Sequence, residues 1–344
     1  MKAFLHIGTA KTGTTTIQHF IHKNKKHLLQ NGYLYPCRPG KTNHEKLAIF
    51  SVESENIQDI HQYLRIDTVE KVNKMNTEFP QKLKQEISLY SCENVIFSNE
   101  YCSSRLIHQE DIVRLKNLLD NFFDDIEFII YLRRQDKFLV SSYSTAILNG
   151  WTKPLGIPSQ VKIENRDNYY NILNKFAKVC GQDKIKVRIF ESSQMINNNL
   201  IWDFMNPIGI EIDDSYNYVS NLNTSIDVDC LEYIRLLNKH LHKIIRHDHK
   251  KYINKIINQL TKYSNGCQNK KRLLLSEKIA RDFMSIFEES NKQVAKIYLD
   301  RQDGKLFNDE RFTDQAIAPT NIIFKLLEIT TFLLKDQLIN PQIG

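Results

Sequence analysis

The sequence predicts an α/β fold in which a P-loop-type parallel sheet is flanked by helices and followed by a helical C-terminal region. Over the first 225 residues, four short apolar segments alternate with segments of helical periodicity. Such alternation is typical of a parallel sheet covered on both faces. A glycine-containing loop joins the first apolar segment to the first helix, and no strand candidate follows residue 226.

The strands are expected at residues 3–8, 94–98, 127–133 and 186–190, where bulky apolar residues run together. From residue 14 the apolar positions take helical spacing, and this helix is expected to end near residues 31–32. Further helices are expected at residues 110–123, 137–149, 168–180 and 199–208, with two or three polar helices within 45–90 and a long loop over 150–167. Beyond the sheet, amphipathic spacing predicts helices at 228–243, 276–298 and 321–337.

The length of 344 residues and the hydrophobic content of 41% allow a substantial core. We expect one domain over residues 1–344, with an α/β core at 1–225 and a helical part at 226–344. No linker separates the two.

The charge and cysteine patterns exclude several classes of protein. The net charge of +7 is mild, and the lysines are scattered, which argues against a nucleic-acid binder. The six cysteines show no C-x-x-C spacing, so neither a zinc site nor a disulfide framework is indicated. Without a signal peptide or an apolar run of about 20 residues, the sequence predicts a cytoplasmic protein with no transmembrane segment. It does not indicate an oligomeric state.

The loop after the first strand has the spacing of a phosphate-binding loop with one change. Gly8 and Gly13 stand as in G-x-x-x-x-G, but the lysine lies inside the loop, at Lys11, and a threonine follows the second glycine. Backbone N–H groups and a helix N-terminus can still cradle an anion. From its position, the Lys11 ammonium is expected to reach a bridging oxygen at the terminal end of a diphosphate-like group, which is the geometry of a phosphosulfate.

The segment Gly8-Thr-Ala-Lys-Thr-Gly-Thr-Thr15 resembles the 5′-phosphosulfate loop of sulfotransferases that use 3′-phosphoadenylyl sulfate (PAPS), with alanine where the family often carries proline. The resemblance implies PAPS as co-substrate, with no metal required. It also implies that Lys11 stabilises the leaving phosphate. The residues implied to bind the phosphosulfate are Lys11, Thr12, Gly13, Thr14, Thr15 and Thr16.

A second motif follows the third predicted strand. Arg133 ends the strand, and Ser141 and Tyr143 lie eight and ten residues later on the next predicted helix. This pattern resembles the 3′-phosphate site of sulfotransferases. The residue types fit such a site because a phosphate on the ribose needs a forked guanidinium and a hydroxyl donor. Arg134 and Ser142 share the same spacing. We favour Arg133 with Ser141, since Tyr143 then also matches the pattern.

Two residues are candidates for the base that takes the proton of the acceptor hydroxyl. Glu100 ends the second predicted strand, where related enzymes place a histidine or glutamate. His44 lies in Asn43-His-Glu-Lys-Leu-Ala48, which is similar to a segment of bacterial relatives. The ordinary pKa of histidine, near 6.5, suits base chemistry, whereas glutamate needs burial to approach it. Topology favours Glu100, and the two could also cooperate.

The function implied by these motifs is transfer of the sulfuryl group from PAPS to an acceptor hydroxyl. Residues 221–238 and 287–307 resemble the helical closing region of bacterial carbohydrate-type sulfotransferases, which implies a saccharide or glycolipid acceptor. Two alternatives remain open. A P-loop kinase would bind ATP with Mg²⁺, and a catalytically silent module would bind the nucleotide without turnover.

Overall fold

The computed structural model describes residues 1–56, 58–160, 163–218, 226–244, 249–266, 271–308 and 329–330. The chain divides into two compact units that interleave along the sequence. The first unit comprises Met1–Arg134, Pro158–Leu222 and Phe287–Glu310, and the second comprises Gln135–Ile157, Asn223–Ile286 and Arg311–Gly344. The expected organisation as a single domain with its internal boundary at residue 225 stays a prediction.

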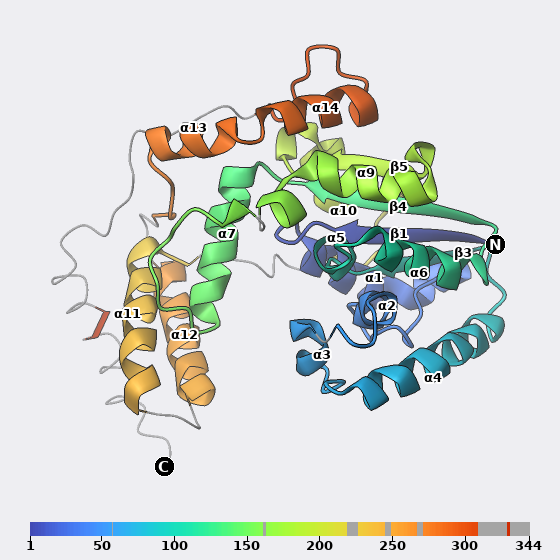
Figure 1. The fold of residues 1–344 in the computed structure, drawn as a ribbon, viewed down its shortest axis with the longest axis horizontal. Coiled ribbons are helices and arrows are strands. Elements are labelled where there is room, and N and C mark those ends of the chain that lie inside the picture. Colours follow the sequence, from blue (N-terminus) through green and yellow to red (C-terminus); the bar gives the residue numbers. More distant parts are fainter. Residues whose placement is uncertain are drawn as a thin grey trace. The chain divides into compact units, whose positions relative to one another are not determined.

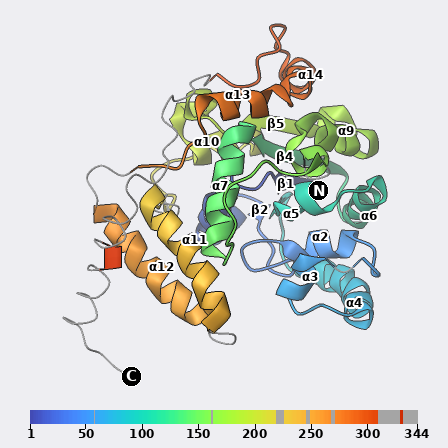
Figure 2. The same ribbon diagram turned by 60° about the vertical axis from the view of Figure 1, so that its left-hand side comes forward.

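The first unit is built on a five-stranded parallel sheet in the order β2-β3-β1-β4-β5 (Figure 1, with β2 labelled in Figure 2). The strands are β1 (Lys2–Gly8), β2 (Tyr33–Leu34), β3 (Asn94–Ser98), β4 (Asp125–Leu132) and β5 (Ile185–Ile189). The α/β class and all four predicted strands are therefore confirmed. The fifth, β2, pairs with β3 over only two residues, which is too short to produce a pattern in the sequence.

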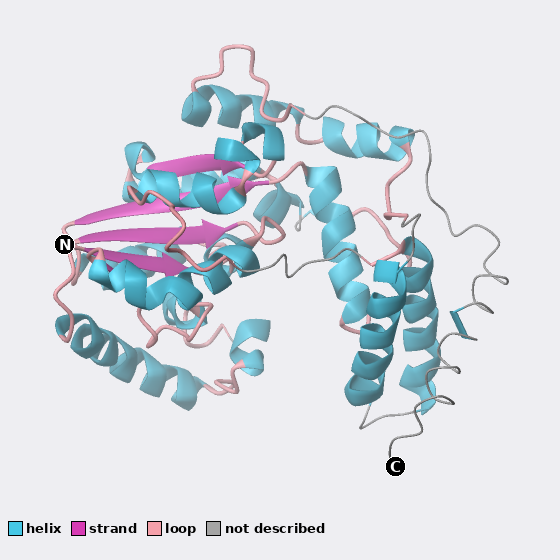
Figure 3. Cartoon of the chain, turned by 180° about the vertical axis from the view of Figure 1, so that it is seen from behind, coloured by secondary structure: helices cyan, strands magenta, loops and turns pink. Residues whose placement is uncertain are grey.

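Helices flank this sheet on both faces (Figure 3). They are α1 (Thr14–Gln30), α2 (Glu45–Ser51), α3 (Asp59–Tyr63), α4 (Val69–Ser88), α5 (Tyr101–Arg105), α6 (Gln109–Asp120), α9 (Tyr169–Cys180), α10 (Leu200–Met205) and α14 (Glu288–Leu299). A π-helical turn at Ile163–Asp167 precedes α9, and short 3₁₀ turns lie at Gln182–Lys184, Ser192–Gln194, Ile196–Asn198 and Asn206–Ile208.

Alternation along the strands divides the core of the first unit into two layers. On β1, Ala3 and Leu5 pack in one cluster with α2, α4, α6, α9 and α14, while Phe4 between them packs in the other with α1 and α10. The same alternation holds on β4, where Ile130 and Tyr131 belong to opposite clusters. Successive strand side chains point to opposite faces, so an apolar run of this kind needs helices on both sides.

The second unit is helical in its described part. It contains α7 (Gln135–Leu148), α11 (Val228–Ile244), α12 (His249–Gly266) and α13 (Glu277–Ser285), and α11 lies alongside α7 and α12 (Figure 2). Its core includes Ile147 of α7, Ile234 of α11 and Leu260 of α12. The Asn238 amide is fully buried and donates to the carbonyls of Ile147 and Trp151, at 2.8 and 3.2 Å.

The helical C-terminal region is confirmed, with differences in detail. The single helix expected at 276–298 is two helices, α13 in the second unit and α14 in the first. Helix α12 had no counterpart among the expected elements. The helix expected at 321–337 falls outside the described residues, apart from 329–330. Among the helices built from described residues, none has the length and apolarity needed to cross a lipid bilayer.

Candidate active site

The glycine loop connects β1 to α1, as the sequence predicts. Its backbone has positive φ at Gly8 (98°), Lys11 (64°) and Gly13 (77°), which turns the chain back onto the sheet edge. The backbone N–H and the hydroxyl of Thr9 both donate to the carbonyl of Tyr131, at 3.0 Å. These bonds hold the loop against the end of β4.

The threonines of the loop have different environments. Thr12 is fully buried, and its hydroxyl donates to the carbonyl of Thr9 at 2.5 Å, so this side chain holds the loop closed. Thr14 is also buried, Thr16 is half-buried and Thr15 is exposed. Helix α1 begins at Thr14 with no acidic residue in its first turn and no side-chain cap. The N–H groups of that turn are the donors that an anion at a helix N-terminus uses.

Lys11 and Arg133 lie close together at this edge. The Arg133 guanidinium donates through Nη1 to the Lys11 carbonyl at 2.8 Å, and its Cζ lies 5.5 Å from the centre of the Phe190 ring. Burial lowers the pKa of Lys11; the Glu100 carboxylate acts in the opposite direction, and the Arg133 charge lowers it further. Three charged side chains from the ends of β1, β3 and β4 are thus within electrostatic reach of one another.

The two arginines at the end of β4 differ in burial. Arg134 is 4% exposed, whereas Arg133 is partly exposed at the loop. The carbonyl of Arg133 accepts a 2.5 Å hydrogen bond from the Tyr169 hydroxyl of α9, which fixes the backbone at this point. Ser141 lies on α7 in the second unit, so its predicted pairing with Arg133 stays a prediction.

Glu100 directly follows β3 and precedes α5. Its Oε2 accepts a hydrogen bond of 2.9 Å from Nε2 of Gln18, a buried residue of α1. The nearby Arg105 does not pair with Glu100: its guanidinium makes two hydrogen bonds to Asp59, at 2.9 and 2.8 Å. The Glu100 carboxylate is thus within electrostatic reach of Lys11, while Arg105 is paired with Asp59.

His44 is fully buried beside β3. Its Nδ1 accepts a hydrogen bond of 3.3 Å from the Ser98 backbone N–H, and the backbone N–H of His44 donates to the Ser98 carbonyl at 3.0 Å. The ring of Tyr35 lies 4.3 Å away, centre to centre. Burial lowers the pKa of His44 to about 3. This imidazole joins the loop before α2 to the sheet, an environment that a loop position in the sequence does not reveal.

Two side chains near Glu100 were not among the residues predicted for the site. One is Gln18, which the helical spacing of α1 places one turn after Thr14. The other is Glu45, the first residue of α2, whose pKa is raised by burial and by the Glu100 carboxylate. The spacing alone could have placed Gln18 on the buried side of α1, but not opposite Glu100.

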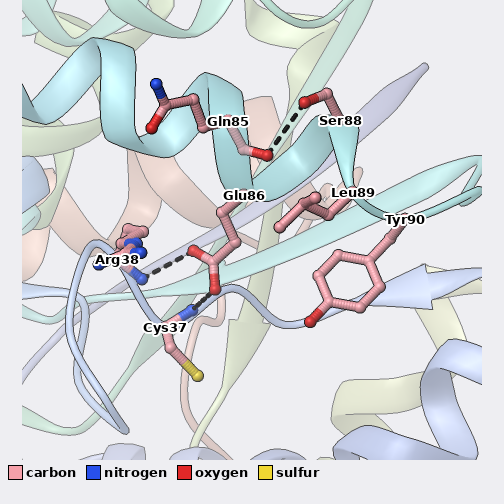
Figure 4. Close-up of a pocket in the computed structure, with 7 residues that line it drawn as sticks. All are labelled: Cys37, Arg38, Gln85, Glu86, Ser88, Leu89 and Tyr90. Atoms are coloured by element: carbon pink, nitrogen blue, oxygen red, sulfur yellow. Dashed lines mark hydrogen bonds between the residues drawn. The ribbon is translucent and has the colours of Figure 1, made fainter.

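A hollow of about 650 Å³ lies elsewhere in the first unit (Figure 4). Its lining comes from the loop after β2 and from the C-terminal end of α4: Cys37, Arg38, Gln85, Glu86, Ser88, Leu89 and Tyr90. The Glu86 carboxylate in it accepts the N–H groups of Cys37 and Arg38, each at 2.8 Å. None of the predicted site residues lines this hollow.

Comparison with known proteins gives limited similarity. No family model matches the chain. An uncharacterised protein from Archaeoglobus fulgidus is 25% identical over 205 residues, which cover 59% of this chain and 55% of that protein. The chain thus spans about half the length of this relative. A crystal structure of a sulfotransferase from Alicyclobacillus acidocaldarius aligns with a TM-score of 0.40 at 14% identity, over 70% of this chain and 94% of that one.

Proposed function

We propose that the chain is a sulfotransferase that moves the sulfuryl group of PAPS to a hydroxyl of a saccharide or glycolipid acceptor. The observation that carries this proposal is the convergence of Lys11, Arg133 and Glu100 at the carboxyl edge of the parallel sheet. Ligands of open α/β sheets bind at this edge, where the connections diverge to opposite faces. Two cations and one carboxylate at a helix N-terminus fit an anionic donor and an acceptor that must lose a proton.

In the proposed reaction, the acceptor oxygen attacks sulfur in line with the bridging oxygen of the phosphosulfate. A bond forms between the acceptor oxygen and sulfur, the bond from sulfur to the bridging oxygen breaks, and the acceptor proton passes to Glu100. Adenosine 3′,5′-bisphosphate leaves with the bridging oxygen. The Lys11 ammonium compensates the charge that develops on this oxygen, and the N–H groups of residues 12–16 hold the 5′-phosphate.

We assign the 3′-phosphate to Arg133 together with Ser141. The partial exposure of Arg133 supports it over Arg134, which is 4% exposed. A ribose phosphate needs a guanidinium that it can reach, and a charge-assisted hydrogen bond of this kind is among the stronger polar contacts.

For the base we favour Glu100 over His44. Glu100 is within electrostatic reach of Lys11, whereas His44 is fully buried and its Nδ1 already accepts a backbone N–H. An acceptor hydroxyl approaching the loop therefore meets the carboxylate. The proposed chemistry uses no metal, and the protein is proposed to act in the cytoplasm.

Calorimetry with adenosine 3′,5′-bisphosphate, compared with ATP and Mg²⁺, tests the donor site. We expect tight binding of the bisphosphate without metal. Arg133→Ala should weaken it by at least about 2 kcal/mol, the range for losing a hydrogen bond to a charged group. Arg105→Ala is the matched control, because Arg105 pairs with Asp59. Binding of ATP with Mg²⁺ instead would identify a kinase, and unchanged affinity in Arg133→Ala would mean that the ribose phosphate lies elsewhere.

Transfer of ³⁵S from labelled PAPS to a panel of glycans and glycolipids tests the reaction. Lys11→Ala should abolish transfer while the circular dichroism spectrum stays that of the wild type. Near-normal transfer in this variant would remove Lys11 from the mechanism. Bisphosphate binding without transfer to any acceptor, or to water, would indicate a silent nucleotide-binding module.

A further inference from the structure

The amide of Gln18 connects the glycine-loop helix to the end of β3. Its side chain is only 4% exposed. Nε2 lies 2.9 Å from Glu100 Oε2, 3.3 Å from Ser98 Oγ and 3.3 Å from Asn43 Oδ1. A primary amide nitrogen has two protons and no acceptor capacity, so all three neighbours accept and one proton is shared between two of them. The shortest contact is the one to the carboxylate.

The direction of these bonds follows from the groups at either end. An ionised carboxylate only accepts, so the nitrogen of the Gln18 amide faces Glu100. Ser98 Oγ also lies 2.9 Å from His6 Nδ1. His6 is fully buried, and burial lowers its pKa to about 3, so its imidazole is neutral near neutral pH. Ser98 Oγ therefore accepts from Gln18 and is also hydrogen-bonded to His6 Nδ1, so the amide, the hydroxyl and the imidazole form one connected network.

We propose that Gln18 is a positioning residue for Glu100, an inference that rests on the proposed function. Its N–H donates to Oε2 at 2.9 Å, which fixes the position of the carboxylate. No hydrogen bond to Oε1 occurs among the described residues, so Oε1 is the oxygen that takes the acceptor proton. Gln18 lies one turn after Thr14, where the helix that would hold the phosphosulfate begins. Helix α1 would thus set the positions of both the phosphosulfate of PAPS and the Glu100 carboxylate.

A purely structural role for a buried amide is the competing explanation, and α1 provides a control for it. Asn24 lies on the same helix and is 2% exposed. Its Nδ2 donates to the carbonyls of Phe20 and Asn217, at 2.9 and 3.0 Å, and makes no bond to Glu100. Asn24→Leu therefore removes an equally buried amide without touching the base.

The test is a double-mutant cycle between Gln18→Met and Glu100→Gln. Methionine keeps the length of the side chain and removes the N–H group that donates to Glu100. Turnover is measured as release of adenosine 3′,5′-bisphosphate from PAPS, with water as the acceptor, so no identified acceptor is needed. We expect Gln18→Met to lower kcat roughly 10- to 100-fold, as for loss of one hydrogen bond to a charged group, while bisphosphate affinity is retained. In the Glu100→Gln background, the same change should have no further effect.

The pH profile gives a second readout that a structural role would not move. In Gln18→Met, Glu100 lacks the hydrogen bond from the amide, so on acidification turnover should fall at a higher pH than in the wild type. Asn24→Leu should keep the wild-type profile. Gln18→Glu, which keeps the shape, should move the acid limb further because two carboxylates then face each other.

Two results would overturn the assignment of Gln18. One is an equal loss of turnover from Gln18→Met in both backgrounds, and the other is unchanged turnover. Should Gln18→Met fail to fold, the pH profile of Gln18→Glu decides alone, and a wild-type profile there counts against the assignment. A wild-type protein that does not bind the bisphosphate overturns the proposed function itself, which is a distinct outcome.

Discussion

Acidification should destabilise the first unit through two histidines buried beside the sheet edge, His6 and His44. Burial lowers the pKa of each to about 3, well below the ordinary value of 6.5. The folded pKa lies below the unfolded one, so the unfolded chain binds these protons first. The stability contributed by the neutral imidazoles is fully present above about pH 6.5 and is lost progressively as the pH falls towards about 3.

The size of this effect follows from proton linkage. Each pH unit between the two pKa values costs about 1.4 kcal/mol per histidine. From about pH 6.5 to about pH 5, each histidine should therefore cost about 2 kcal/mol, and the pair about 4 kcal/mol. Both side chains are fully buried, so solvent screening does not reduce the figure.

Urea unfolding followed by tryptophan fluorescence measures this loss in the first unit alone. The chain has two tryptophans, Trp202 on α10 of the first unit and Trp151 in the second. Trp151→Phe leaves Trp202 as the reporter. In that background, His6→Asn and His44→Asn keep an amide, which can donate or accept, near the position of Nδ1 and remove the titration. Each should reduce the pH-dependent loss by about 2 kcal/mol. A wild type whose stability changes by less than about 1 kcal/mol over this range would refute the reasoning.

Two further substitutions test contacts around the site. Asp203 is fully buried and accepts hydrogen bonds from both Nε and Nη2 of Arg188. Asp203→Asn leaves this half-buried guanidinium without its partner charge, so it should lower the free energy of unfolding in urea by about 3 kcal/mol. Arg105→Ala should cost no more than about 1 kcal/mol, because its ion pair with Asp59 is partly exposed, and it should leave turnover of PAPS unchanged. A large loss of turnover in Arg105→Ala would instead show that Arg105 acts on Glu100, the proposed base.

The sequence predicts the sheet and the loop because their signals are local. Apolar runs marked four of the strands, and parallel strands bring their carboxyl ends to one edge, so Lys11, Glu100 and Arg133 could be placed near one another. The two-residue strand β2 carries no such signal and exists only through its pairing with β3. It could therefore be identified only from the structure of the sheet.

The parts of the candidate site that were not predicted depend on tertiary contacts. A histidine in a polar loop is usually solvated, yet His44 is buried against β3 by bonds to the backbone of Ser98. Gln18 is one of several polar residues on α1, and only the approach of β3 to that helix selects it as the partner of Glu100. Spacing along a helix gives the face of a residue but not what that face meets.

The first glycine of the loop links the position of the proposed base, Glu100, to that of the loop proposed to hold PAPS. A Cβ atom at Gly8 would lie 2.9 Å from both Cα and Cβ of Glu100, and φ there is +98°. Gly8→Ala must therefore displace the segment that carries Glu100, in addition to a backbone strain of roughly 1–2 kcal/mol. Gly32→Ala is the matched control, because φ is +83° but no atom lies within 4 Å.

We expect both glycine variants to lose similar stability from backbone strain, and only Gly8→Ala to lose turnover of PAPS. The measurements are urea unfolding and bisphosphate release for each variant. Since Glu100 Cα is a backbone atom with no rotamer to adopt, the contact can be relieved only by moving the start of α5 or the loop itself. Either movement is expected to separate Glu100, the proposed base, from Lys11. Full turnover in Gly8→Ala would therefore show that the reaction does not depend on the distance between these two residues.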